Sequence, residues 1–320
     1  MTTEHSQHTP VMVDEVVRYL QPHSGGYYID ATLGGGGHTA AILEHSAPRG
    51  CVLGIDADPR ALERVRFRLD SAIEAGRLVL VHSNFAELDR VTREFHVPPV
   101  QGVLLDLGFS SDQMADPQRG LSFSVEGPLD MRFDPSLAIS AADIINTASE
   151  EELADIFWKY GEERRSRQIA WRIVQERIRQ PLTRTTQLAA LVAAGVPRKA
   201  GAIHPATRVF QALRIAVNHE LERLETVLPH LLDVLSAPQN GEVGGRVVII
   251  SFHSLEDRIV KEFMRHEARD CICPPHTPVC VCGHKARIRL LTRKPVTASE
   301  QEVMLNPRAR SAKLRVAELL

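Results

Sequence analysis

Short apolar runs alternate with amphipathic stretches through the first third of the chain. Four runs are apolar at nearly every position and have the length of strands: 27–32, 51–56, 78–82 and 103–107. Between them, and before the first of them, apolar residues recur at helical spacing. Strands that are apolar throughout and alternate with helices are typical of a parallel sheet covered on both faces. The pattern therefore predicts a doubly wound α/β domain.

The alternation breaks after the fourth run. Residues 109–135 are rich in Ser, Asp, Gly and Pro, and amphipathic helical stretches follow them. One helix opens at Ser149 with a capping-box pattern, and the last is predicted to run from 209 to about 235. The run 246–252 then restores the strand pattern. We expect a discontinuous α/β domain, 1–112 with 208–320, and a helical insertion, 113–207, that roofs the carboxyl ends of the strands.

Composition allows a large core and indicates no membrane protein. The 320 residues are 43% hydrophobic and 24% charged, and the net charge is only −2. The segment 271–320 carries nine cations and three acids, so it is a candidate phosphate-binding face or a solvated basic tail. The first seven residues do not resemble a signal peptide, and no run has the length of a membrane span. We expect a cytoplasmic protein.

A run of four glycines, Gly34 to Gly37, follows the first predicted strand and precedes a helix. Glycine lets the backbone take positive φ and lets a ligand approach the main chain. Asp56 ends the second predicted strand, 22 residues after Gly34, where a carboxylate can accept hydrogen bonds from ribose hydroxyls. The arrangement predicts an adenosine cofactor. The spacing Gly35-x-Gly37-x-x-Ala40 also fits a nicotinamide dinucleotide fingerprint, so this alternative stays open.

Polar residues also follow the later strands. Asp106 ends the fourth predicted strand, and Ser110, Ser111 and Gln113 come shortly after it. His253 follows the strand 246–252 and is a second, weaker catalytic candidate. The carboxyl ends of parallel strands are where such folds bind their ligands. These residues are therefore candidates for the reacting end of the site.

A polar stripe is predicted on the helix that begins near Arg208. Arg208, Gln211, Arg214 and Asn218 are spaced three, three and four residues apart and share one helical face. Two arginines on one face suit a phosphate or a base edge, although an exposed polar face has the same spacing.

Four of the five cysteines lie within twelve residues, at Cys271, Cys273, Cys280 and Cys282. His276 and His284 are nearby. Four thiolates at this density are candidates for a structural zinc site, but the C-x-C spacing is unlike the common C-x2-C knuckle. A reduced cysteine-rich loop is the alternative.

Several motifs in this order resemble the RsmH (MraW) family, the bacterial 16S rRNA cytosine-N4 methyltransferases. The resemblance covers nearly the whole chain, with small departures at Phe109 and Asp112. The motifs are His8–Val11, Asp30–His38, Asp106–Ser111, Gly127–Arg132, Tyr160–Arg164, His204–Asn218, Ser251–Lys261 and Asn306–Ser311.

The resemblance implies a class I, Rossmann-like methyltransferase fold, S-adenosylmethionine as methyl donor and an inserted helical domain for RNA recognition. It implies that Asp56 binds the ribose and Phe85 flanks the adenine, while the glycine turn and His38 surround the methionine part. The cofactor-site residues expected in all are Gly35, Gly36, Gly37, His38, Asp56, Phe85, Asp106 and Gln113.

The implied substrate is a decoding-centre cytosine near the P site of 16S rRNA, in the small ribosomal subunit. Asp106 is then the first candidate for hydrogen bonding the reacting amine. The candidate substrate contacts are Ser110, Ser111, Arg132, Arg208, Arg214 and Asn218. A non-enzymatic RNA-binding or assembly factor with a relic pocket is a further alternative. The sequence leaves the oligomeric state, monomer or homodimer, open.

Overall fold

The computed structural model describes residues 10–194, 204–239, 243–274, 277 and 279–320. The chain forms two compact units. The first is discontinuous and combines Met1–Gly108 with Leu221–Leu320, and the second is Phe109–Glu220. The expected boundaries were at 112/113 and 207/208, so the second unit is larger than the sequence pattern indicated and includes the helix that carries the polar stripe.

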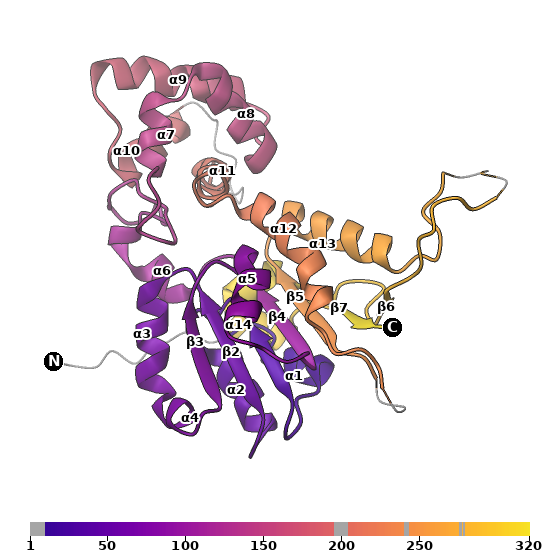
Figure 1. Ribbon diagram of the computed structural model, residues 1–320. Helices are drawn as coiled ribbons and strands as arrows, with labels where there is room; N and C mark the ends of the chain where they lie inside the picture. The colour runs from indigo at the N-terminus through magenta and orange to yellow at the C-terminus, as the bar shows by residue number, and fades with distance from the viewer. Residues whose placement is uncertain (1–9, 195–203, 240–242, 275–276, 278) are drawn as a thin grey trace. The chain divides into compact units, whose positions relative to one another are not determined.

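A seven-stranded sheet forms the centre of the first unit (Figure 1). Its strand order is β3-β2-β1-β4-β5-β7-β6, in which the first five strands pair in parallel and β7 runs antiparallel to both of its neighbours. This reversed seventh strand is the mark of a class I methyltransferase sheet, so the expected fold class is confirmed. The strands are β1 (Tyr27–Asp30), β2 (Cys51–Asp56), β3 (Leu78–His82), β4 (Gly102–Asp106), β5 (Arg246–Ser251), β6 (Ile288–Leu290) and β7 (Lys313–Leu319).

Helices cover both faces of the sheet, because side chains along each strand alternate between two apolar cores. In β5, Val247 and Ile249 pack with one core, while Val248 and Ile250 pack with the other. The first core includes residues of α5, α12 and α13, and the second includes residues of α1, α2 and α3 (Figure 1). The helices of this unit are α1 (Val13–Leu20), α2 (Gly37–His45), α3 (Pro59–Arg68), α4 (Asp70–Glu74), α5 (Leu88–Glu94), α12 (Glu220–Asp233), α13 (Ser254–Glu267) and α14 (Glu300–Leu305).

The second unit is helical and has a core of its own, which includes Leu153, Phe157, Ile173 and Leu213. A Cβ at Gly161 would lie 2.6 Å from the carbonyl oxygen of Arg208, so glycine lets α8 and α11 approach backbone to backbone. Its helices are α6 (Ser111–Ala115), α7 (Ala141–Thr147), α8 (Glu150–Gly161), α9 (Ser166–Arg179), α10 (Thr185–Ala194) and α11 (Ala206–Asn218).

The single long helix expected over 209–235 is wrong. The chain forms α11 and α12 with a break at His219, whose φ of 50° is left-handed. Apolar periodicity continues through this residue, so the pattern alone could not reveal the break. None of the helices in the described ranges has the length and apolarity of a membrane span.

Candidate functional site

Three aspartates lie at the carboxyl ends of neighbouring strands. Asp30 ends β1, Asp56 ends β2 and Asp106 ends β4. The register aligns these ends, because Asp30 is opposite Leu104 and Asp106 is opposite Ile250. This edge of the sheet is where doubly wound folds bind ligands. It is the candidate site that the sequence predicted.

The glycine turn between β1 and α2 is shaped by its backbone. Gly34 and Gly36 have φ of 52° and 70°, a left-handed conformation that side chains disfavour. A Cβ at Gly36 would lie 2.7 Å from Val65, and one at Gly37 would lie 2.6 Å from Pro10. The turn can therefore hold no side chain at these positions without moving its neighbours, and it brings bare main chain to the start of α2.

Asp56 is anchored by main-chain donors. Its carboxylate accepts hydrogen bonds from the N–H groups of Gly34, at 2.7 Å, and Asp58, at 2.8 Å. Burial raises the pKa of this carboxyl to about 6, and the two hydrogen bonds oppose that rise. Each carboxylate oxygen has a second lone pair, so Asp56 retains acceptor capacity for the ribose hydroxyls that the sequence assigned to it.

Two threonine hydroxyls support the same edge, and the sequence analysis missed them. Thr39 donates to the Asp30 carboxylate at 2.7 Å, and the N–H of Asp106 donates to the Thr32 hydroxyl at 2.6 Å. Asp30 is 1% exposed, and burial raises the pKa of its carboxyl. Thr32 lies in the quoted Asp30–His38 motif and Thr39 directly follows it, but the sequence gave no sign of the contacts that their hydroxyls make.

Asp106 differs from the other two aspartates because one of its oxygens is unused. Its Oδ1 is buried and has no hydrogen-bond partner among the described residues. Its Oδ2 lies 3.7 Å from Nδ1 of His38, which is too long for a hydrogen bond. Nε2 of His38 lies 2.9 Å from the Val11 carbonyl oxygen, so this nitrogen carries the proton.

Burial is also the main influence on the protonation of Asp106. It raises the pKa of the carboxyl to about 6, while the nearby His38 ring opposes the rise and Asp30 adds to it. Arg308, in a 3₁₀ turn that follows α14, also lowers this pKa through its charge. Arg308 is part of the Asn306–Ser311 motif, but the sequence analysis gave it no role.

Two further predicted residues of the first unit lie at the starts of helical segments that follow strands. Phe85 begins a 3₁₀ turn directly after β3 and is partly buried against the core. His253 is the N-cap of α13, and its Nδ1 accepts a hydrogen bond from the N–H of Glu256 at 3.4 Å. Its Nε2 lies 3.0 Å from the Glu256 carboxylate. His253 thus has a structural role, and its catalytic role stays a prediction.

Gln113 and the serine candidates belong to the second unit. Ser110 and Gln113 form the capping box of α6. The Ser110 N–H donates to Oε1 of Gln113 at 2.9 Å, and the Gln113 N–H donates to Oγ of Ser110 at 3.1 Å. The side chain of Ser111 lies outside the described residues. The proposed contacts of all three with cofactor or substrate stay predictions.

The polar stripe of α11 is engaged within the second unit. Arg214 makes a two-pronged ion pair with Glu220, at 2.8 and 2.9 Å. Asn218 is 1% exposed. Its side-chain amide accepts a hydrogen bond from the Phe133 N–H and donates one to the Met131 carbonyl oxygen, both at 2.8 Å. These side chains connect α11 with Glu220 and with the loop that carries the Gly127–Arg132 motif.

The other two arginines proposed for substrate binding are less enclosed. Arg208 is about half exposed and lies 3.9 Å from Glu163. Arg132 pairs with Asp130 at 2.7 Å and also donates to the carbonyl oxygens of Pro135 and Leu137. Their contacts with substrate stay predictions, but only part of the stripe faces solvent.

The basic carboxyl-terminal segment is partly neutralised. At least four of its nine cations pair with acids of the first unit. The pairs are Arg287 with Asp233, Arg289 with Glu318, and Lys313 and Arg315 with Asp257. These pairs engage at least four of the nine positive charges that suggested a phosphate-binding face.

The residues at this edge of the sheet suit an adenosine-containing cofactor. The glycine turn presents bare main chain, Asp56 has free lone pairs, and Phe85 supplies an aromatic side chain. The buried, unpartnered Oδ1 of Asp106 requires a donor that the described residues do not provide. A bound ligand with N–H groups would satisfy it.

Comparison with known proteins identifies the family. The model of the MraW methylase family matches residues 5–320. Proteins named "Ribosomal RNA small subunit methyltransferase H" are similar along their whole length. The one from Thermomicrobium roseum is 56% identical over 97% of this chain and 93% of its own. Those from Heliobacterium mobile and Syntrophotalea carbinolica are each 50% identical, and cover 97% and 100% of this chain and 98% and 100% of their own. The chain therefore belongs to the MraW methylase family, and S-adenosylmethionine is the cofactor that its class I fold binds.

Proposed function

We propose that the chain transfers a methyl group from S-adenosylmethionine to the exocyclic N4 of a P-site cytosine in 16S rRNA of the small ribosomal subunit. The observation that carries the proposal is the buried, unpartnered Oδ1 of Asp106 at the end of β4, in a chain that matches the methylase family over residues 5–320. Family membership decides against the nicotinamide-dependent oxidoreductase that the Gly35-x-Gly37-x-x-Ala40 spacing left open. A ribosomal substrate also supports the expected cytoplasmic location.

The chemistry explains why an acceptor is needed at this place. The lone pair of the cytosine N4 amine is delocalised into the ring, so the amine is a weak nucleophile. A carboxylate that accepts one of its N–H groups favours pyramidal nitrogen and stabilises the positive charge that develops there. Asp106 is preorganised for this role, because Thr32 holds its main chain and its Oδ1 has no competing partner.

The cofactor supplies an activated methyl group on a sulfonium. The protein's part is to bind and orient it: Gly34 to Gly37 present the main chain, Asp56 accepts hydrogen bonds from the ribose, and Phe85 lies against the adenine. His38 adjoins the methionine part and lies beside Asp106. These assignments follow the family motif, residue by residue.

The ionised form of Asp106 is the stronger hydrogen-bond acceptor for the amine and the only form that can take up its proton. With a pKa of about 6, most of the carboxyl is ionised at pH 7.5 or so and the acceptor form is lost as the pH falls below 6. The raised pKa also makes the carboxylate a stronger base than an ordinary aspartate. It can therefore receive the amine proton more readily after methyl transfer.

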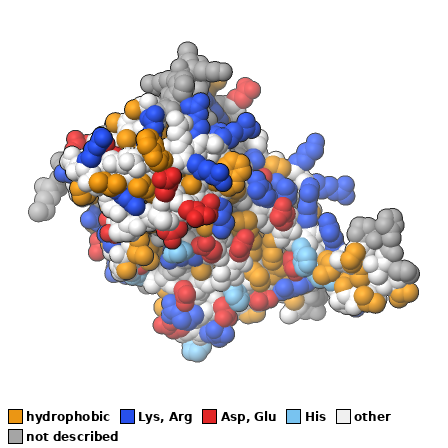
Figure 2. All heavy atoms as spheres, turned by 90° about the horizontal axis from the view of Figure 1, so that it is seen from above, with side chains coloured by type: hydrophobic (Ala, Val, Ile, Leu, Met, Phe, Trp, Pro, Cys, Tyr) orange, Lys and Arg blue, Asp and Glu red, His pale blue; other side chains and the backbone are white. Residues whose placement is uncertain are grey.

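We propose that the second unit recognises the RNA. Exposed aromatic and basic side chains are interleaved on α8 and α9, where Trp158 and Trp171 are 60% and 52% exposed. Between Lys159 and Arg179 there are seven cations and three acids. Figure 2 shows blue and orange side chains next to one another on the face that it presents. Aromatic and cationic side chains together suit unstacked bases and phosphates.

The target base has to leave its stack to reach a buried carboxylate. Arg208, which is half exposed, is the leading candidate for a phosphate contact, followed by Arg132 and Arg214, which have protein partners. Ser110, Ser111 and Asn218 are proposed to position this unit's loops around the substrate.

The direct test uses labelled S-adenosylmethionine and purified small ribosomal subunits that lack the modification, followed by nucleoside mass spectrometry. We expect N4-methylcytidine at a single decoding-centre position. Label in another nucleoside would overturn the assigned acceptor. If neither the small subunits nor naked 16S rRNA is labelled while the chain still binds S-adenosylhomocysteine, a non-enzymatic assembly factor is favoured instead.

A further inference from the structure

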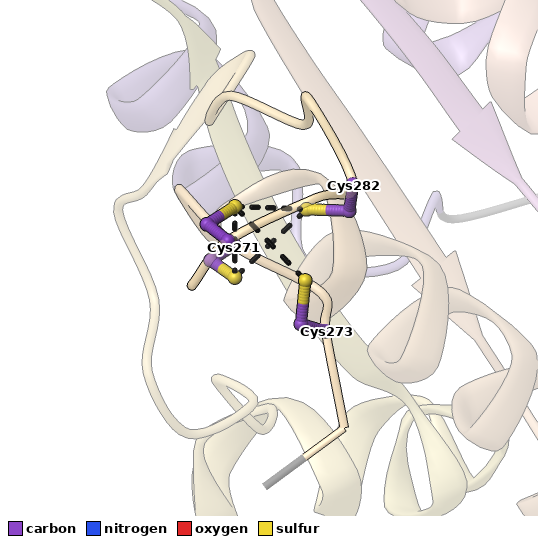
Figure 3. Close-up of side chains that lie close together, drawn as sticks. Cys271, Cys273 and Cys282 are labelled. Carbon is purple, nitrogen blue, oxygen red and sulfur yellow. Dashed lines mark hydrogen bonds between the residues drawn. The ribbon is translucent and has the colours of Figure 1, made fainter. Parts of the chain in front are cut away.

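Four cysteines meet in the loop between α13 and β6. Cys271 and Cys273 come from one arm of the loop, and Cys280 and Cys282 come from the other. Figure 3 shows their sulfur atoms pointing toward one another. All four sulfurs lie within 4.8 Å of each other, although the side chains are exposed or half-buried.

The distances between these sulfurs have the size of a tetrahedron's edge. Zinc–thiolate bonds of about 2.3 Å at tetrahedral angles place the sulfurs about 3.8 Å apart. The closest Sγ–Sγ distances in the loop are 3.5, 3.5, 3.8 and 4.0 Å. A tetrahedron of sulfurs of this size accommodates a single metal ion at its centre.

Disulfides would leave a different arrangement. A disulfide joins two sulfurs at about 2.05 Å and excludes a third. Here Cys280 is close to three other sulfurs at once, at 3.5, 3.5 and 4.0 Å. All four side chains therefore converge on one point, a convergence that two separate disulfides would not require.

Main-chain N–H groups point at the sulfurs. The N–H of Ile272 lies 3.5 Å from Sγ of Cys282, and that of Val281 lies 3.5 Å from Sγ of Cys273. Each donor comes from the arm opposite its acceptor. N–H donors to sulfur stabilise thiolates and orient metal ligands.

Apolar burial does not account for the shape of this loop. Val279 and Val281 are 72% and 83% exposed, and the loop projects from the body of its unit (Figures 1 and 2). A small loop without a core is ordered most effectively by a metal, whose binding energy becomes folding energy. The four cysteines supply the thiolates with which this loop can bind a metal ion.

We propose that Cys271, Cys273, Cys280 and Cys282 bind one zinc ion as a closed, structural tetrathiolate site. Four protein ligands leave no open position for water or substrate, which is the pattern of structural rather than catalytic zinc. Tetrahedral sulfur ligation also suits iron. Zinc is the assignment because methyl transfer needs no electron from this loop.

The nearby histidine is engaged elsewhere. Nε2 of His284 lies 3.2 Å from the carbonyl oxygen of His266, and the two rings are in edge contact with centroids 4.9 Å apart. His276 lies outside the described residues. The ligand set is therefore the four thiolates, and binding the ion releases the protons of those thiols.

The test measures metal in the full-length chain, independently of methyl transfer. Elemental analysis of the purified protein is expected to find about one zinc per chain. The Cys273→Ser/Cys282→Ser double variant is expected to lose it. The matched control is Cys51→Ser, because Cys51 is the only cysteine outside the loop and lies at the start of β2. This control should retain the full zinc content.

A second measurement does not depend on how the double variant folds. In the Cys51→Ser background, titration with an organomercurial reagent should release zinc in proportion to the modified thiols and reach full release at four equivalents. Four freely reactive thiols without metal, an intact mass that reveals disulfides, or bound iron instead of zinc would each overturn the assignment. So would a double variant that folds and retains the zinc.

Discussion

Two polar clusters of this chain were both candidates for function, yet they use their hydrogen-bonding groups differently. At the end of β4, Asp106 has a buried carboxylate oxygen without a partner among the described residues. On α11, Arg214 and Asn218 are matched by internal partners at 2.8–2.9 Å. The first cluster leaves an acceptor unused, and the second is matched within its own unit.

The difference shows how a binding site can be separated from a structural network of the same composition. A buried polar atom without a partner loses free energy in the unliganded protein, so its persistence favours a ligand that satisfies it. A satisfied network needs no such explanation. Residue type and helical spacing do not distinguish the two cases, because both clusters contain charged side chains at regular positions.

The largest expected effect is on catalysis. Replacing Asp106 with Asn should lower the rate of methyl transfer by about 10²- to 10³-fold, because the neutral amide is a weaker acceptor than the carboxylate and cannot take up the amine proton. The dissociation constant of S-adenosylhomocysteine, measured by calorimetry, should change little. The matched control is Asp70→Asn, an exposed carboxylate on α4, which should leave the rate unchanged. Full activity of Asp106→Asn would remove Asp106 from the chemistry.

The second prediction concerns stability. Asn218→Ala should lower the free energy of unfolding by about 1–3 kcal/mol, because it leaves the Phe133 N–H and the Met131 carbonyl without their buried partner. Chemical denaturation with a probe in the second unit measures this loss. An unchanged midpoint would show that the network contributes nothing, and the distinction between the two clusters would fail.

The pH dependence gives the third prediction. Since the acceptor is the ionised carboxyl and its pKa is about 6, the single-turnover rate should fall about tenfold per pH unit below 6 and be flat above 7 or so. The residual rate of Asp106→Asn should not show this fall at low pH. If the variant retains the same profile, another group controls the titration. Asp56, whose pKa is also raised to about 6, would then be the first alternative.

The smallest expected effect is at the exposed end of the stripe. Arg208→Ala should change the free energy of unfolding by less than about 1 kcal/mol, because its ion pair with Glu163 is long and half exposed. If Arg208 contacts a phosphate, the same change should weaken RNA binding and reduce its salt dependence by about one ion. Binding isotherms at several salt concentrations measure both quantities. An unchanged slope would leave Arg208 without a role in RNA binding.

The sequence predicted much of the α/β unit because its signals are local. The strand Cys51–Asp56 has the predicted bounds. The helix α3 after it also begins with a local signal, since Asp58 accepts from the N–H of Arg60 at 3.0 Å and Pro59 is the first helical residue. The break at His219 was not predictable in this way. A left-handed residue that is not glycine carries no local mark, and the apolar spacing continues through it.

The placement of the candidate residues at strand ends was predictable for the same reason, while their roles stay predictions. The strand-end rule located Asp56 and Asp106 without any contact information. Arg308, which is about 200 residues later in the chain, joins the surroundings of Asp106 through tertiary folding alone. Likewise, the spacing of Arg214 and Asn218 revealed their shared face, but not that partners within the second unit would occupy it.

The most direct test of the open acceptor is an experimental structure of the chain with S-adenosylhomocysteine and cytidine bound. The account predicts that the N4 amine of cytidine donates a hydrogen bond to Oδ1 of Asp106, at the usual length of about 2.9 Å. An Asp106 carboxylate bonded to another protein group, with the cytidine amine held elsewhere, would contradict it.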